Sequence, residues 1–207
     1  MPARILLVRH GRSALPRPGG WLAPDDVRAW RASYDATGIR PDERPPVALC
    51  ARAASAGAIL ASDLPRATAS AERLAAGRPV LATPLLRESP LPIPHWPRAR
   101  LPFAVWEGAI HAWWGWRAVL GVGGSSGERE RARAAATLLV DHARSGDVVV
   151  VTHGVFRTLL RAALLSAGWE REGSHRSFAC WSAWTFRLPG PVAIRRDLVS
   201  DGEPPRR

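Results

Sequence analysis

The stretch that decides the fold reads Arg-Ile-Leu-Leu-Val-Arg-His-Gly-Arg and spans residues 4–12. Its apolar, partly β-branched run, residues 5–8, predicts a strand buried on both faces, as in a parallel sheet. Arg9, His10 and Gly11 follow without a break, at the edge where open α/β sheets bind ligands. A histidine beside a fixed positive charge can act as a neutral nucleophile or, when protonated, as an anion contact. Both roles indicate phosphate.

A second apolar run, residues 58–61, leads into Ser-Asp-Leu-Pro-Arg at residues 62–66. Pro65 suits the first turn of a helix, where its missing N–H costs nothing. Arg66 would then stand in that first turn, beside unpaired backbone N–H groups and the positive end of the helix dipole. The sequence therefore predicts a second guanidinium at the same edge of the sheet as Arg9.

Two more strand ends supply the remaining polar groups. Residues 147–152 contain four consecutive valines and run into His153 and Gly154, which enter another helix. The short strand-like run 81–83 is followed closely by Glu88. We therefore expect two imidazoles, two guanidiniums and one carboxyl group to meet at one edge: His10, His153, Arg9, Arg66 and Glu88.

These motifs together resemble the histidine phosphatase superfamily, which contains the cofactor-dependent phosphoglycerate mutases. The resemblance rests on Leu7-Val8-Arg9-His10-Gly11, Ser62-Asp63-Leu64-Pro65-Arg66-Ala67, Leu86-Arg87-Glu88 and Val151-Thr152-His153-Gly154. The matches occur in the family's order and cover most of the chain outside residues 89–121. We expect a three-layer α/β/α sandwich around a mostly parallel sheet. The resemblance implies six strands with one antiparallel, for which residues 178–188 are the candidate.

The resemblance also implies a phosphohistidine mechanism without metal or other cofactor. His10 would attack phosphorus, while Arg9, Arg66 and His153 would bind the phosphoryl oxygens. Glu88 would protonate the leaving oxygen and then activate water.

Elementary chemistry agrees with these roles. A phosphoryl group in transit carries spread negative charge, so fixed cations are the main catalytic device, and the planar fork of arginine suits its oxygens. A nucleophilic histidine must stay unprotonated on the attacking nitrogen, so we expect a backbone carbonyl to hold its other nitrogen. Partial burial can tune a carboxyl group to act as an acid near neutral pH.

The loop after His10 departs from the family pattern. Arg12 stands where the family usually has an acid or amide, and Pro16 and Arg17 stand where it often has an asparagine a few residues on. The hydroxyl of Ser13 can contact phosphate or cap a turn. We count Ser13 and Gly154 among the candidate phosphate-binding residues.

Length and composition bound the remaining possibilities. The 207 residues are expected to form one domain, 1–207, with a generous core. The net charge is +11, but all 29 basic residues are arginines scattered along the chain, which favours coding bias over nucleic-acid binding. The isolated Cys50 and Cys180 suggest a reducing, cytoplasmic compartment. The first residues lead directly into a predicted strand, so we expect no signal peptide.

No cluster of histidine, cysteine or acidic residues has the spacing of metal ligands, so we expect no metal site. The periodic patterns predict further elements on both sides of the motifs described above. Helices are expected over 25–34, 47–56, 65–76, about 125–144 and 155–167, a final strand over 192–199, and a flexible tail over 201–207.

The segment least like the family is 89–121. Five prolines between residues 90 and 102 prevent a helix there, and residues 103–120 then hold four tryptophans. Several roles remain open for this insertion: a cap over the active site, ordinary packing onto the core, a homodimer face, or contact with a membrane surface. Charged and polar residues interrupt the stretch, which argues against stable membrane insertion. We favour the cap.

The function expected from the sequence is that of a phosphoric monoester hydrolase of the histidine acid phosphatase type, acting on a small phosphorylated metabolite. One alternative is a phosphoglycerate mutase-like phosphotransferase, and another is a phosphate-binding protein without turnover, against which the intact polar set argues. A phosphatase for phosphohistidine in proteins is a further alternative. Such proteins tend to be shorter and to lack the acid, so Glu88 and the 89–121 insertion favour an alkyl phosphate.

Overall fold

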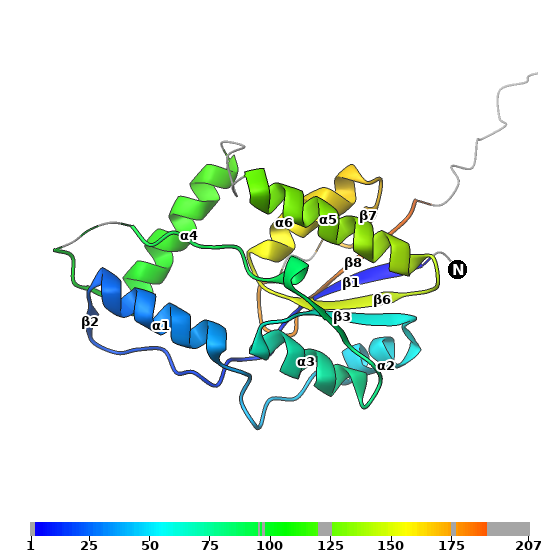
Figure 1. Cartoon of the computed structure of the whole chain (residues 1–207), viewed down its shortest axis with the longest axis horizontal. Coiled ribbons are helices and arrows are strands. Elements are labelled where there is room, and N and C mark those ends of the chain that lie inside the picture. The colour runs from blue at the N-terminus through cyan, green and yellow to red at the C-terminus, as the bar shows by residue number, and fades with distance from the viewer. Residues whose placement is uncertain (1–2, 95, 97, 120–125, 175–176, 190–207) are drawn as a thin grey trace, which may run out of the picture.

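A six-stranded sheet organises the protein, whose computed structural model describes residues 3–94, 96, 98–119, 126–174 and 177–189 (Figure 1). The strand order is β4-β3-β6-β1-β8-β7. The sheet contains β1 (Arg4–Arg9), β3 (Ala58–Ser62), β4 (Leu81–Thr83), β6 (Val148–Thr152), β7 (Glu170–Glu172) and β8 (Ala183–Arg187).

The sheet is mostly parallel, as predicted. β1, β3, β4 and β6 pair in parallel, whereas β8 runs antiparallel to both of its neighbours, β1 and β7. β8 is shorter than the predicted strand 178–188, because residues before Ala183 form a turn in which Trp181 has a φ of 61°. The strand predicted over 192–199 and the tail over 201–207 lie outside the described residues.

Alternating residues of the central strands face two separate cores. Ile5 and Leu7 pack on the side of α5 (Ser126–Ala143) and α6 (Phe156–Ser166). Leu6 and Val8 pack on the side of α2 (Val47–Ser55) and α3 (Pro65–Ala75). Each fully buried aliphatic side chain contributes roughly 1.5–3 kcal/mol relative to an exposed one. The result is the predicted three-layer α/β/α sandwich (Figure 1).

The helix α3 begins as the sequence predicts. Pro65 occupies its first turn and Arg66 follows, and the helix ends before Ala76, which has a left-handed φ of 48°, and Gly77, which has a φ of 90°. Arg66 is thereby fixed at the amino end of a helix that starts beside the carboxyl end of β3.

A smaller core lies beyond the carboxyl ends of the parallel strands (Figure 1). Here α1 (Pro24–Ala36) and α4 (Phe103–Val119) pack with the short paired strands β2 (Trp21–Leu22) and β5 (Leu101–Pro102). We call the buried residues Val27, Trp106 and Ile110, with the apolar side chains packed on them, the outer cluster. Trp106 is fully buried, and its Nε1 donates a hydrogen bond to the Leu22 carbonyl at 2.9 Å.

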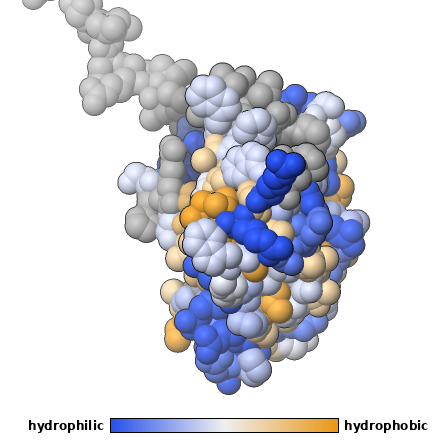
Figure 2. Space-filling model, turned by 90° about the vertical axis from the view of Figure 1, so that its left-hand side faces the viewer, coloured by the Kyte–Doolittle hydropathy of each residue, from blue (hydrophilic) through white to orange (hydrophobic). Residues whose placement is uncertain are grey.

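The tryptophans of α4 have different surroundings. Trp106 is buried, whereas Trp113 and Trp116 are 50% and 62% exposed. Figure 2, which views the molecule from the side of α1 and α4, shows hydrophobic side chains in small separate groups among hydrophilic ones. Within the described part of the chain, no helix combines the length and apolarity needed to cross a membrane. The homodimer face remains a prediction.

Candidate functional site

The ends of two adjacent strands bring two histidines together. β1 ends at Arg9, and β6, its parallel neighbour, ends at Thr152. The His10 backbone N–H donates to the Thr152 carbonyl at 3.1 Å, which fixes His10 beside the first residue after β6. The ring centroids of His10 and His153 consequently lie 5.1 Å apart.

His10 is held in a neutral and oriented form. Its Nδ1 lies 2.7 Å from the Gly11 carbonyl oxygen, so Nδ1 carries the hydrogen and Nε2 keeps its lone pair. Burial, the charge of Arg66 and then that of Arg9 lower the pKa of His10 to about 3, although the Gly11 hydrogen bond opposes this shift. The side chain is 2% exposed. The backbone partner expected for His10 is therefore present.

Gly11 is required by close packing. A Cβ atom at this position would lie 2.8 Å from Cζ2 of Trp181 and 2.9 Å from Cγ of Glu43. The Gly11 N–H donates to the Ser70 hydroxyl at 2.9 Å, which ties the loop after β1 to α3. The loop that carries His10 is therefore anchored on both sides.

His153 is buried, and one of its ring nitrogens is paired. Its Nε2 lies 2.8 Å from the hydroxyl oxygen of Ser62, the last residue of β3. Burial, followed by the nearby His10 and Arg66, lowers the pKa of His153 well below its usual value. Its Nδ1 is buried and has no hydrogen-bond partner among the described residues. In the tautomer in which Nδ1 carries the hydrogen, it is available to donate to an anion.

Arg66 is buried and anchored by α1. Its Nη1 donates to the Tyr34 carbonyl and its Nη2 to the Asp35 carboxylate, each at 3.0 Å. Its guanidinium also lies over the Tyr34 ring, 4.3 Å from the centroid. Its Nε is buried and unpaired within the described part of the chain. Two partners that sequence reasoning did not identify, Tyr34 and Asp35, thus orient a predicted phosphate-binding residue.

Arg9 and Gly154 lie against each other. A Cβ atom at Gly154 would be 3.6 Å from Cζ of Arg9, an ordinary contact distance. The Arg9 Nη1 donates to the Phe178 carbonyl, and its Nε is buried with no partner in the described residues. The Arg9 guanidinium therefore lies against the backbone that leads into α6, and its Nε–H has no partner among the described residues.

Glu88 is held at the amino end of α6. One carboxylate oxygen accepts hydrogen bonds from the backbone N–H of Phe156 at 2.8 Å and of Ser89 at 3.0 Å. The other accepts from Val155 at 3.4 Å. The Thr152 hydroxyl, by donating to the Leu86 carbonyl at 2.8 Å, fixes the turn before Glu88. A carboxylate here satisfies unpaired N–H groups of the helix, in addition to facing the site.

The departure from the family pattern at Arg12 has a local explanation. Its Nε donates at 2.8 Å to the buried carboxylate of Glu43, which also accepts from Nε1 of Trp181 at 2.7 Å. Burial alone would raise the pKa of Glu43, but the hydrogen bonds from Arg12 and Trp181 outweigh it and lower this pKa. Sequence reasoning missed Glu43, because nothing in its neighbourhood marks it as buried.

Ser13 takes part in a turn. Its hydroxyl oxygen accepts the Leu15 N–H at 3.2 Å, and its backbone bridges to Ile39. Of the two roles left open by the sequence, the turn contact is therefore present in the structure. Phosphate contact by Ser13 remains a prediction.

A second buried arginine, Arg157 in α6, binds the turn that precedes β8. It donates to the Ser182 carbonyl at 2.7 Å and the Ser177 carbonyl at 2.9 Å, and stacks 3.9 Å from the Trp184 centroid. Burial and then the charge of Arg9 lower the pKa of Arg157 to about 9, against the opposing effect of Glu88. Arg157 ties α6 to the turn before β8.

A cleft of about 700 Å³ opens over this edge of the sheet. Four predicted site residues line it: Arg9, Ser13, Glu88 and Gly154. The other three, His10, Arg66 and His153, are almost fully buried and are not among its lining residues. Four of the predicted residues thus line a cleft to which α1 and α4 also contribute walls.

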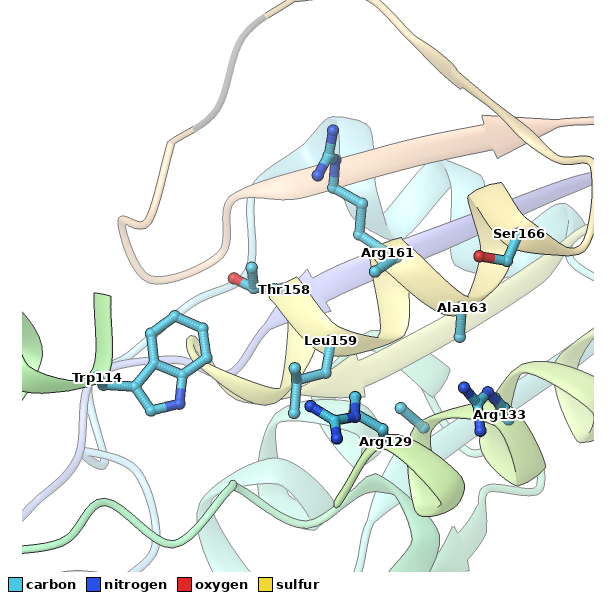
Figure 3. Close-up of a pocket in the computed structure, with 10 residues that line it drawn as sticks. Trp114, Arg129, Arg133, Thr158, Leu159, Arg161, Ala163 and Ser166 are labelled. Atoms are coloured by element: carbon cyan, nitrogen blue, oxygen red, sulfur yellow. The ribbon is translucent and has the colours of Figure 1, made fainter. Parts of the chain in front are cut away.

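A smaller cavity of about 380 Å³ lies between α5 and α6, close to Trp114 (Figure 3). In Figure 3 the guanidinium of Arg161 points away from those of Arg129 and Arg133, so the three cations do not converge. None of the predicted site residues lines this cavity. Among the described residues, no group of three or more histidine, cysteine or acidic side chains is placed to hold a metal ion.

Comparisons with known proteins place the chain in a family. The family model described as "Histidine phosphatase superfamily (branch 1)" matches residues 5–193. Mycobacterial glucosyl-3-phosphoglycerate phosphatase Rv2419c in complex with VO3 is 21% identical, with a TM-score of 0.53, covering 90% of this chain and 97% of that one. YhfR of Bacillus stearothermophilus is 21% identical, with a TM-score of 0.53, and the match covers 90% of this chain and 92% of that one.

The open reading frame Rv3214 of Mycobacterium tuberculosis is 20% identical, with a TM-score of 0.51, covering 88% and 90% of the two chains. At these identities the likeness to the solved structures concerns the fold. No curated protein matches the chain significantly.

Proposed function

The chain belongs to the histidine phosphatase superfamily, and within it we propose a metal-independent phosphomonoesterase that acts through phospho-His10 on a small phosphorylated metabolite. One observation carries this proposal. Arg9, Arg66 and His153 each keep a buried nitrogen that has no partner among the described residues. Buried polar groups are rarely left unpaired, and a phosphoryl group beside His10 would satisfy all three.

The first chemical step is attack by Nε2 of His10 on phosphorus. A P–N bond forms while the bond from phosphorus to the ester oxygen breaks, and Glu88 gives that oxygen a proton. The low pKa of His10 supports this role, because the attacking nitrogen stays unprotonated at ordinary pH. Arg9 and Arg66 stabilise the charge that spreads over the phosphoryl oxygens.

The second step transfers the phosphoryl group to water. Glu88, now ionised, takes a proton from the attacking water, the P–N bond breaks, and inorganic phosphate leaves with His10 neutral again. Transfer to a second substrate instead of water would make the protein a mutase. The reaction product distinguishes the two activities, since only the hydrolase releases inorganic phosphate in the absence of an acceptor.

We further propose that residues 1–207 act as one domain, with 89–121 as its cap. Four residues of that segment support this role because they line the cleft: Ile93, Phe103, Ile110 and Trp114.

We also propose a reducing compartment, the cytoplasm, as the location of the protein. Both cysteines are free and half-buried, which supports this proposal.

A pair of alanine variants tests the proposed nucleophile. His10→Ala should lower kcat/KM for glycerol 1-phosphate by at least about 10⁴-fold, since no other group replaces the lost covalent step. His142→Ala, in α5 and away from the cleft, is the matched control and should keep wild-type activity. Circular dichroism and thermal melting verify that both variants fold. Near wild-type phosphate release by folded His10→Ala would disprove the assignment.

A further inference from the structure

We propose that the alcohol part of the substrate is bulky, flat and mostly apolar, and carries no carboxylate. This inference rests on the proposed function and names the substrate class for the same cleft. It is carried by two independent features of the cleft walls: a row of aromatic side chains, and the pairing of the arginines that line them.

The aromatic row starts at a phosphate-binding residue. The Arg66 guanidinium stacks 4.3 Å from the Tyr34 centroid, and the Tyr34 ring stacks on Trp30 at 5.0 Å with an interplanar angle of 24°. Trp30 then meets Phe103 of α4 edge to face at 4.5 Å. All three aromatic residues line the cleft. The row therefore forms a wall that leads from the phosphate end towards α4.

Other apolar residues extend this wall. Ile110 and Trp114 from α4, and Leu91 and Ile93 from the proline-rich stretch, line the same cleft. Its volume of about 700 Å³ is far more than a three-carbon alcohol needs and lies within the range for ligands of drug size. Aromatic faces pack best against flat, apolar groups. An ester group held near Glu88 would direct such an alcohol along the row.

The charges of the cleft disfavour a second anionic group on the substrate. Arg12 is paired with Glu43 at 2.8 Å and Arg17 with Glu107 at 3.0 Å. Arg31 lies 4.0 Å from Asp35, a carboxylate that it shares with Arg66 at 3.0 Å. Of the described arginines that line the cleft, Arg9 alone has no carboxylate partner, and it lies at the phosphate end.

To bind Arg12 or Arg17, a substrate carboxylate would have to displace a protein carboxylate from that arginine. Glu107 would also repel it, because this side chain lines the cleft. A neutral apolar alcohol makes neither demand.

The test compares three alkyl phosphates whose leaving oxygens are similarly basic. Differences in kcat/KM among them then reflect binding of the alcohol part rather than the ease with which it leaves. They are 2-naphthylmethyl phosphate, glycerol 1-phosphate and phosphoserine. We expect kcat/KM for the naphthylmethyl ester to exceed that for phosphoserine by about 10- to 100-fold, mainly through KM. Equal or higher kcat/KM for phosphoserine or glycerol phosphate would overturn the inference.

Variants of the aromatic row show whether it causes this preference. Trp30→Leu and Phe103→Leu should each reduce the ratio of naphthylmethyl to glycerol phosphate kcat/KM by about three- to tenfold. Trp116→Leu, an exposed tryptophan of α4 that does not line the cleft, should leave the ratio unchanged. An equal loss for both substrates in the two row variants would show a structural role only and contradict the inference.

The charge argument has its own test. Glu107→Gln removes the carboxylate that neutralises Arg17 while keeping the side-chain size. We expect kcat/KM for phosphoserine to rise about twofold to fivefold relative to glycerol phosphate, a modest gain because the pair is partly exposed. No gain for phosphoserine would contradict the inference that the arginine–carboxylate pairs exclude a substrate carboxylate.

Binding measurements separate this inference from the proposed function. Calorimetry with His10→Ala should give tighter binding of 2-naphthylmethyl phosphate than of phosphoserine, by about tenfold or more. If the wild-type protein hydrolyses none of the esters but this preference is found, the proposed function fails and the inference stands. If hydrolysis depends on His10 but phosphoserine binds at least as tightly, the inference fails alone.

Discussion

The sheet edge and the outer cluster form two sides of one cleft, but they are built differently. At the sheet edge, each polar residue ends a strand or follows it within a short turn, and the strand positions it. In the outer cluster, Val27 of α1 packs with Trp106 and Ile110 of α4, which lie about eighty residues further along the chain. The first side is determined by local sequence order, and the second by packing between distant segments.

The difference suggests a division of labour. The sheet edge holds a neutral histidine among buried cations, an arrangement that needs rigid backbone supports such as the His10–Thr152 hydrogen bond. The outer wall instead presents apolar surface from α1 and α4, where side chains can vary in size without disturbing the strands. The rate of the chemical steps would then depend on the sheet edge, and the preference among substrates on the apolar wall formed by α1 and α4.

After His10→Ala, the largest effect is expected at Glu88. For an alkyl phosphate, Glu88→Gln should reduce the rate by about 10² to 10⁴, the usual contribution of a general acid. Nitrophenyl phosphate should lose distinctly less in its phosphorylation step, since nitrophenolate leaves without a proton. Pre-steady-state bursts measure that step separately from water attack. Equal slowing of both esters would indicate that Glu88 serves mainly to hold the start of α6 through its bonds to Phe156 and Val155.

Trp106→Ala tests whether the outer cluster is energetically separate from the sheet. Removing a fully buried tryptophan that also hydrogen-bonds the Leu22 carbonyl should cost about 3–5 kcal/mol in packing. Hydrogen exchange should then show the loss of protection in α1 and α4 before β1 and β6. Trp116→Ala, on the same helix but exposed, should change stability by less than about 0.5 kcal/mol. Uniform loss of protection across the sheet would mean that the two regions unfold as one.

Acid sensitivity is the next effect in size. His10 has a pKa of about 3 in the folded protein and about 6.5 when unfolded, so the unfolded chain binds more protons between these values. Stability is therefore complete above pH 6.5 and falls as the pH drops towards 3, by up to about 1.4 kcal/mol per pH unit for this group. His153 acts in the same direction.

Urea unfolding at several pH values measures this slope. His10→Asn should make it shallower, whereas His142→Asn, whose position is away from the site, should leave it unchanged. An identical slope in wild-type and His10→Asn proteins would contradict the low pKa.

Chelation is expected to have no effect. In the proposed mechanism arginines supply the positive charge that a metal would bring to phosphoryl transfer, so EDTA should leave kcat and KM within about twofold of the untreated values. A phosphate-release assay before and after prolonged dialysis against the chelator makes the comparison. Loss of activity that a divalent ion restores would require a different mechanism.

The sequence predicted the residues of the sheet edge because strand ends are visible in a single chain. His10, Arg66 and His153 each follow an apolar run, and parallel strands bring such positions together. The same logic explains why Ser62 could have been identified, since it ends β3 and contacts His153 at 2.8 Å. Its role is not visible in the sequence, because a serine that begins the run Ser-Asp-Leu-Pro-Arg resembles an ordinary turn residue.

Other contacts could not be predicted from local patterns. Asp35 pairs with Arg66 across 31 positions, and Glu43 pairs with Trp181 across 138. The pairing of β2 with β5 joins residues 21–22 to 101–102 without any periodic signal. Such contacts follow from the packing of segments that are distant in the sequence, which depends on side-chain shape rather than on the spacing of apolar residues.

Trapping the phosphoenzyme tests the central claim most directly. Rapid quenching of wild-type protein with a ³²P-labelled alkyl phosphate should yield a labelled peptide that contains His10, with the label stable in base and lost in acid. Glu88→Gln should accumulate less label from an alkyl ester than from nitrophenyl phosphate. Rapid turnover without any labelled peptide, or label on a residue other than His10, would contradict the account.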